Sequence, residues 1–370
     1  MLSRLRREAA TLCGYLAFIF LTFFGDALAP EAIGSFMAGM MLVALFVIML
    51  WLAFCVVRHA EGLATLLGEP YGTLILTLSV IGIEVALISA VMITGENKPA
   101  LARDTMFAVL MIVLNGLVGL SLVLGGLRHR LQNYNLQGAN AYLAVLIPLA
   151  VLGLILPSFT PSAPGGQLSE LQAFFLIGLS LILYGIFLAI QTVTHSDIFQ
   201  DPAREQHGDP ATHHHHIAES VPSHSIGLIA AMLPIVLLSK SLAVYVDFGI
   251  DAARAPVALG GFLIAALVLT PEGLSAIQAA RQNMLQRAVN ICLGSALATI
   301  ALTIPAVLAI GWIMDRRVEL GLGSAGIVEL SATLLVSIVT FASPRTNVLL
   351  GAVHLALFAA YIMLIFDGSV

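Results

Sequence analysis

Charged residues are scarce in this sequence. Only 10% of its 370 residues are Asp, Glu, Lys or Arg, whereas 59% are hydrophobic. A soluble chain of this length could not enclose so much apolar surface in one core, so the composition excludes a soluble globular protein. Apolar runs of about 20 residues, the length that crosses the hydrocarbon layer, recur along the chain. The sequence therefore predicts an all-α integral membrane protein whose partner is the lipid bilayer.

Three further scarcities narrow the function. Cys13, Cys55 and Cys292 stand singly in apolar segments, so neither a disulfide framework nor a thiolate metal site is expected. Sixteen basic residues against 21 acidic ones indicate no nucleic-acid partner. The His-Glu-x-x-His pattern of metal-dependent hydrolases is missing from the sequence. We expect a protein that is not an enzyme and has no bound cofactor.

The apolar runs between clusters of charge, Pro and Gly predict about eleven transmembrane helices. They lie near residues 11–29, 33–57, 70–94, 104–127, 139–158, 170–194, 224–246, 255–280, 286–314, 323–343 and 347–366. The first of them is interpreted as a retained helix rather than a cleaved signal peptide, because its apolar run is long and lacks a clear cleavage site. Helices of this kind leave no room for a large soluble domain.

Two glutamates mark an internal repeat. Glu84 in "TLILTLSVIGIEVALIS" and Glu272 in "GFLIAALVLTPEGLSAI" each follow an apolar run and a helix-weakening residue, Gly82 or Pro271. Each glutamate lies in the second helix of a predicted five-helix block. Residues 1–30 form the N-terminal helix, residues 31–194 the first block and residues 224–370 the second. Because five is odd, consecutive blocks insert in opposite orientations, which is the inverted-repeat plan of many secondary transporters.

Residues 195–223 form the one long polar segment and predict a flexible, acidic and His-rich linker. Its run of His213, His214, His215 and His216 has a regulatory interpretation as a metal sensor, and a plainer one as a solvated linker.

The positive-inside rule predicts the orientation of the chain. With the N-terminus in the cytoplasm, the inner loops hold Arg4, Arg6, Arg7, Arg58, Arg128, Arg130, Arg204, Arg281, Arg287 and Arg345. The outer loops then hold Lys98, Arg103, Arg254, Arg316 and Arg317. We expect a cytoplasmic linker and a C-terminus outside; the bacterial inner membrane is the location that the resemblance described below implies.

A carboxylate at the bilayer centre costs about 2.5 to 3.5 kcal/mol even on lenient insertion scales, so it predicts a function. Two such groups held close together repel and lose hydration, so they favour protons until a cation arrives. Glu84 and Glu272 are therefore the candidate cation and proton ligands. The alternative is that each acid pairs with a structural base such as Lys240 or His354.

Further oxygen ligands are available beside the two acids. Pro271 lacks an N–H and so removes the helix bond to the carbonyl of Leu267, and Gly82 loosens the backbone beside Glu84. Ca²⁺ takes six to eight oxygens, including carbonyls and hydroxyls. The candidate auxiliary ligands are Gly82, Asn115, Leu267, Thr270 and Ser295.

The chain resembles the calcium/cation antiporter superfamily, and within it the cation/proton exchanger branch of the bacterial ChaA type. The segments that carry the resemblance are "GEPYGTLILTLSVIGIEVALISA", "LTPEGLSAI", "QRAVNICLGSALATIALTIP" and "PRTNVLLGAVHLALFAAYIM". The resemblance implies that Glu84 and Glu272 are the shared ligands, with Ser295 in the second Gly-Ser motif. The acids stand in "IGIE" and "LTPE", where relatives carry an Asn-Ala sequence before the Glu, so fewer side-chain oxygens are expected.

The resulting prediction is a Ca²⁺/H⁺ antiporter that expels cytoplasmic cations by alternating access, with inorganic cations and protons as its partners. A Na⁺ or K⁺/H⁺ antiporter at the same site is the first alternative, and a Na⁺/Ca²⁺ exchanger the second. A channel, or a membrane scaffold subunit with structural acids, is the alternative of a different class. The oligomeric state stays open.

Overall fold

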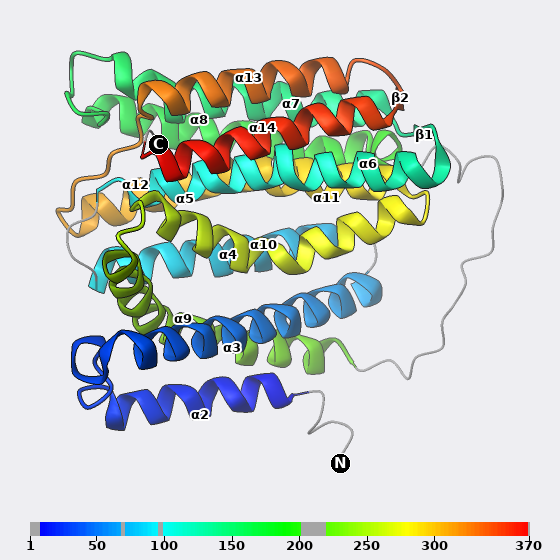
Figure 1. Cartoon of the computed structure of the whole chain (residues 1–370). Helices are drawn as coiled ribbons and strands as arrows, with labels where there is room; N and C mark the ends of the chain where they lie inside the picture. Colours follow the sequence, from blue (N-terminus) through cyan, green and yellow to red (C-terminus); the bar gives the residue numbers. More distant parts are fainter. Residues whose placement is uncertain (1–7, 68–70, 95–98, 201–219, 369–370) are drawn as a thin grey trace. The chain divides into compact units, whose positions relative to one another are not determined.

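The computed structural model describes residues 8–67, 71–94, 99–200 and 220–368. Almost all of these residues are helical (Figure 1). The α-helices are α2 (Ala9–Phe24), α3 (Pro30–Leu67), α4 (Tyr71–Thr94), α5 (Leu101–Leu110), α6 (Val118–His129), α7 (Leu136–Ala150), α8 (Glu170–Ala189), α9 (Val221–Ala253), α10 (Ala258–Arg281), α11 (Leu285–Ala298), α12 (Ile304–Ile313), α13 (Ser324–Thr340) and α14 (Val348–Asp367).

Short π- and 3₁₀-helical segments extend or join these helices. Segment η1 (Met111–Leu117) joins α5 to α6, and η6 (Thr299–Thr303) joins α11 to α12. After α7 come η2 (Val151–Ile155) and η3 (Leu156–Phe159), and after α8 come η4 (Ile190–Thr194) and η5 (Ser196–Phe199). π-Helical turns inside α-helices are rare and occur often at functional sites. Here η1 and η6 each interrupt the helix that follows a glutamate-bearing helix.

Among the described residues, eight helical segments are long and apolar enough to cross a membrane, as an integral membrane protein requires. Three shorter apolar helical segments lie where the remaining predicted spans were expected: Ala9–Phe24, Thr77–Ser89 within α4, and Ser324–Thr340. Large apolar side chains are exposed, as lipid-facing residues are: Phe23 is 79% exposed, Phe36 82% and Leu171 80%. The count of eleven spans and the inverted repeat stay predictions.

Helix α3 is longer than the sequence predicts. The second span was expected to end near residue 57, yet α3 continues to Leu67 and includes Arg58 and His59. Polar residues do not end this helix because partners elsewhere in the chain satisfy them, as described below. Near its other end α3 bends at Gly34, whose φ of 78° suits glycine.

The chain forms two compact units, and α10 runs from one into the other. The first unit comprises residues 1–101 and 218–271, and the second comprises residues 102–217 and 272–370. Each unit takes helices from both predicted five-helix blocks, so the units are not the blocks themselves.

In the first unit α3 lies along α9, and α2 and α4 pack against these two helices (Figure 1). The core between them includes Met49, Leu52, Leu238 and Leu242, each at most 2% exposed. At Gly14 of α2 a Cβ would lie 2.8 Å from a methyl carbon of Leu52. Small residues of this kind let membrane helices approach closely, because packing rather than hydrophobicity drives their association.

In the second unit α14 packs on α6 and η1, α11 packs on α7 and η1, and α13 packs on α14. Gly119 and Gly351 face each other, and a Cβ at Gly351 would lie 2.8 Å from the carbonyl oxygen of Gly119. A two-residue antiparallel pair joins β1 (Gln132–Asn133) to β2 (Arg345–Thr346). This pairing places the turn after α6 beside the turn after α13.

Three turns of the second unit are joined by hydrogen bonds from side chains to backbone carbonyls. Gln132 Nε2 donates to the carbonyl of Ala280 at 2.8 Å, and the hydroxyl of Tyr134 donates to the carbonyl of Ser343. His129 Nε2 lies 2.9 Å from the carbonyl oxygen of Arg281. The turns after α6, α10 and α13 therefore lie at one end of this unit, as the predicted topology requires of these loops.

The start of the predicted linker is packed rather than free. Phe199 in η5 is buried, and its ring contacts those of Tyr142 and Phe187. Asn290 Nδ2 also donates to the carbonyl of Phe199 at 2.6 Å. One aromatic side chain thus anchors a segment whose composition otherwise indicates a loop.

Candidate functional site

Glu272 is a buried carboxylate inside an uninterrupted helix. Its side chain is 7% exposed, and α10 continues on both sides of it from Ala258 to Arg281. The helix passes through Pro271, which has no N–H to donate to the carbonyl of Leu267. A carboxylate and a backbone carbonyl without its usual helix donor therefore occupy consecutive turns of α10.

Ser295 is the first partner of this carboxylate. Its hydroxyl donates to Oε2 of Glu272 at 2.9 Å, from the last turn of α11. Both residues are named by the sequence analysis, and the structure brings them together. A hydrogen bond to one carboxylate oxygen favours the charged form and fixes its orientation.

The glycine after the acid positions α10. A Cβ at Gly273 would lie 2.7 Å from a methyl carbon of Leu117, the last residue of η1. Only a residue without a side chain permits that approach. Three consecutive residues therefore have three roles: Pro271 lacks a backbone donor, Glu272 supplies the carboxylate, and Gly273 allows the close contact with η1.

Glu84, the other predicted acid, lies in the first unit. Its side chain is 1% exposed, in α4. Gly82, one of the candidate auxiliary residues, faces α9, since a Cβ there would lie 3.0 Å from Cε of Met232. Each predicted acid is thus buried on a helix whose neighbouring glycine contacts another helix of the same unit.

Thr270 and Ser79 use their hydroxyls on their own helices. Thr270 donates to the carbonyl of Ala266 and Ser79 to that of Ile75, both at 2.6 Å. Such bonds to the residue four positions earlier compete with the backbone ladder and bend helices. Their hydroxyl oxygens retain acceptor capacity, so the role of Thr270 as an auxiliary ligand stays a prediction.

Asn115 lies in a buried polar network. Within η1 its amide donates to Oγ1 of Thr333 at 2.8 Å, and its Oδ1 lies 3.2 Å from Nδ1 of His354. The other ring nitrogen of His354 lies 2.9 Å from Oγ1 of Thr340. Both ends of the amide are therefore engaged with side chains of α13 and α14, and the role of Asn115 as an auxiliary ligand stays a prediction.

The two bases that offered a structural alternative lie elsewhere. His354 uses both ring nitrogens in the network of Asn115, and Lys240 is exposed on α9. A third acid, Glu329 in α13, is 6% exposed, and among the described residues its Oε1 has no hydrogen-bond partner. The run His213 to His216 lies outside the described residues.

Sequence reasoning missed Thr333 and Thr340 as buried polar groups of this region. Thr333 and Thr340 are separated by seven positions, two helical turns, and so share one face of α13. That periodic spacing is the signal that could have found them.

Known proteins and a family model match this chain over most of its length. The family model described as "Sodium/calcium exchanger protein" matches residues 37–193 and 223–366. The sodium-potassium/proton antiporter ChaA of Escherichia coli (strain K12) is 45% identical over 321 residues, 85% of each chain. A Ca(2+)/H(+) antiporter of Aphanothece halophytica is 22% identical over 311 residues, which cover 80% of this chain and 82% of that protein.

Two solved structures share the fold. Native YfkE superposes with a TM-score of 0.71 at 19% identity, over 94% of this chain and 99% of that chain. The H+/Ca2+ exchanger CAX superposes with a TM-score of 0.69 at 13% identity, over 94% of this chain and 87% of that chain. The gap between the two matched family segments falls at the predicted linker.

Proposed function

Because the chain belongs to the sodium/calcium exchanger protein family, we propose that it is a secondary active cation/proton antiporter. The relatives of known name that it resembles include proton-coupled antiporters for monovalent cations and for Ca²⁺. The observation that carries the proposal is the buried carboxylate of Glu272, hydrogen-bonded to Ser295 in the turn of α10 that contains Pro271.

In this proposal Glu272 and Glu84 hold either protons or a cation. A buried carboxylate away from water is far more stable when it is protonated or bound to a cation than when it is bare. Proton and cation therefore exclude each other at one site, and exposure of that site to either side of the membrane in turn couples their movements. The hydroxyl of Ser295 and the carbonyl of Leu267 add oxygens of the kind that Ca²⁺ prefers.

We propose Ca²⁺ as the cargo, since two carboxylates neutralise one divalent ion as they neutralise two protons. The 45% identity to a sodium-potassium/proton antiporter favours a second candidate, Na⁺ or K⁺/H⁺ exchange at the same residues. A Na⁺/Ca²⁺ exchanger is the third candidate and would need no pH gradient.

The test uses proteoliposomes with an acidic interior, a pH-sensitive dye and the membrane potential clamped. External Ca²⁺, Na⁺ or K⁺ is added, and loss of the proton gradient is followed for wild type, Glu84→Gln and Glu272→Gln. Glu329→Gln is the matched control, because it neutralises another buried glutamate that the proposal does not use. We expect a Ca²⁺ response that both site variants abolish and the control keeps.

Other outcomes discriminate among the candidates. A response to Na⁺ or K⁺ alone supports the monovalent alternative, and Ca²⁺ movement driven by Na⁺ without pH dependence supports the Na⁺/Ca²⁺ exchanger. Retention of the wild-type response in either site variant contradicts the assignment of the ligands. If none of the three cations dissipates the gradient in wild type, the antiporter proposal is wrong.

A further inference from the structure

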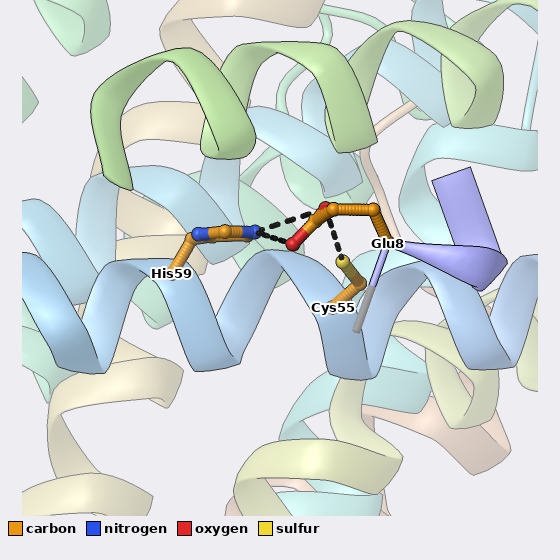
Figure 2. A group of neighbouring side chains, drawn as sticks. All are labelled: Glu8, Cys55 and His59. Atoms are coloured by element: carbon orange, nitrogen blue, oxygen red, sulfur yellow. Dashed lines mark hydrogen bonds and ion pairs between the residues drawn. The ribbon is translucent and has the colours of Figure 1, made fainter. Parts of the chain in front are cut away.

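A second cluster of ligand-type side chains lies in the first unit, on residues that the proposed transport site does not use. Glu8, directly before α2, meets Cys55 and His59 of α3, and their donor atoms all lie within 4.8 Å of one another (Figure 2). His59 Nε2 lies 3.3 Å from Oε1 of Glu8, and Cys55 Sγ lies 3.9 Å from Oε2. Cys55 and His59 are four positions apart and so share one face of α3.

The two separations from Glu8, 3.3 Å to His59 and 3.9 Å to Cys55, are close to those of a tetrahedral transition-metal site. Zn²⁺ bonds of about 2.0 to 2.3 Å place neighbouring ligand atoms about 3.3 to 3.8 Å apart. A thiolate, an imidazole and a carboxylate form a borderline-soft ligand set, which suits Zn²⁺ or Co²⁺ and not the oxygen-seeking Ca²⁺.

Arg58 shows where a cation would lie. Its Nη2 is 3.1 Å from Oε1 of Glu8, 3.1 Å from Sγ of Cys55 and 3.4 Å from Nε2 of His59. One guanidinium nitrogen thus contacts all three donor residues at once. The side chain of Arg58 is 42% exposed, so it can turn outward into solvent without breaking the core.

His224 holds the imidazole of His59 in the orientation that a metal requires. The two Nδ1 atoms lie 3.2 Å apart, on α3 and α9. If Nδ1 of His59 carries the hydrogen and donates it to His224, the lone pair of Nε2 points toward Glu8 and Cys55. Metal-binding histidines nearly always donate their second ring N–H to such a partner.

We propose that Glu8, Cys55 and His59 bind a transition metal of the zinc class, with His224 as the positioning residue and Arg58 as the group that the metal displaces. Binding requires loss of the thiol proton from Cys55, because the thiolate is the ligand. The metal fastens the residue before α2 to α3, separately from the transported cation.

The test uses Co²⁺ as a spectroscopic probe on the purified full chain, with His213 to His216 replaced by serine so that the run cannot bind it. We expect one Co²⁺ per chain and a thiolate-to-cobalt charge-transfer band. Cys55→Ser and His59→Ala should abolish the band, and His224→Ala should weaken Co²⁺ binding by about 10- to 100-fold. Cys292→Ser, which alters a buried cysteine of the other unit, should leave it unchanged.

Two further measurements make the proposal falsifiable where a variant is unstable. Zn²⁺ should raise the melting temperature of wild type, and Arg58→Gln should bind Co²⁺ more tightly because the competing guanidinium is gone. Absence of the charge-transfer band in wild type, or its survival in Cys55→Ser, overturns the site. Equal or weaker binding by Arg58→Gln overturns the displacement of Arg58.

Discussion

His59 and His224 face each other across α3 and α9, with their ring centroids 5.4 Å apart and the ring planes inclined by 67°. Each ring also covers a glycine of the opposite helix, since a Cβ at Gly227 would overlap His59 and one at Gly62 would overlap His224. Each helix thus has a histidine and, three positions later, a glycine, and the histidine of one helix packs on the glycine of the other. This reciprocal packing explains how α3 continues as a helix through polar residues near its end.

The first prediction concerns this packing. Gly227→Ala should destabilise the protein by about 1 to 3 kcal/mol, the usual cost of overpacking, because the ring of His59 must move. Gly39→Ala is the control on α3, where an added Cβ would meet no atom within 4 Å. Thermal melting in detergent measures both, and equal melting temperatures for the two variants would show that the ring has space to shift.

The second prediction concerns Ser295. Ser295→Ala removes the hydrogen bond that favours the charged carboxylate of Glu272, so Glu272 should release its proton less readily. Hydrogen bonds to charged groups contribute about 1.5 to 3 kcal/mol, so the apparent cation affinity near neutral pH should fall roughly tenfold or more. Cation-dependent proton release should accordingly begin at higher pH. Ser180→Ala, at a buried hydroxyl of α8, is the control, and identical pH profiles for the two variants would argue against the role of Ser295.

The third prediction tests whether Asn115 is structural. A double-mutant cycle of Asn115→Leu and Thr333→Val should give a coupling energy of about 0.5 to 3 kcal/mol, since the two side chains share a hydrogen bond. The control cycle pairs Asn115→Leu with Ser337→Ala, whose hydroxyl donates to the backbone carbonyl of Thr333. Unfolding equilibria measure both cycles. Equal coupling energies in the two cycles would contradict a specific contact.

The fourth prediction concerns alkaline pH. Burial raises the pKa of Tyr134, which lies in the turn after α6. Above about pH 10 the unfolded tyrosine loses its proton while the folded one keeps it, so this contribution to stability falls as the pH rises. Tyr134→Phe should cost about 0.5 to 1.5 kcal/mol at neutral pH through its lost hydrogen bond, yet lose less stability between pH 9 and about pH 11. Melting curves across that range decide, and parallel losses in both proteins would be evidence against the effect.

Much of the helical layout follows from local composition. Most predicted spans lie within a few residues of the observed helices, because the length of an apolar run sets a membrane helix and is a local property. Helices α3 and α9 continue further, to Leu67 and Ala253. Ser295 was predicted as an auxiliary ligand near the acids, and the structure places it beside Glu272. The polar extension of α3 was missed, since its partner Glu8 lies 50 positions from Arg58.

The features that the sequence did not predict depend on contacts between residues far apart in the chain. Thr333 lies 218 positions from Asn115, and His224 lies 165 positions from His59. Apolar periodicity reports which face of a helix is buried but not which helix covers it. For the same reason three isolated cysteines predicted no metal ligand, although one of them lies beside a glutamate and a histidine.

The turns at the end of the second unit have a consequence for how the chain tolerates change. They are held by amide, phenol and imidazole groups that bind backbone carbonyls, and among the described residues no ion pair involves Arg128, Arg130, Arg281 or Arg345. Arg281 and Arg345 take part in these joints only through their backbones. The charges that the positive-inside rule counts are therefore on side chains that do not hold the turns together. Substitution of these arginines can therefore alter the insertion signal while the side-chain hydrogen bonds between the turns remain. Substitution of Gln132 or Tyr134 can alter those hydrogen bonds while the loop charges remain.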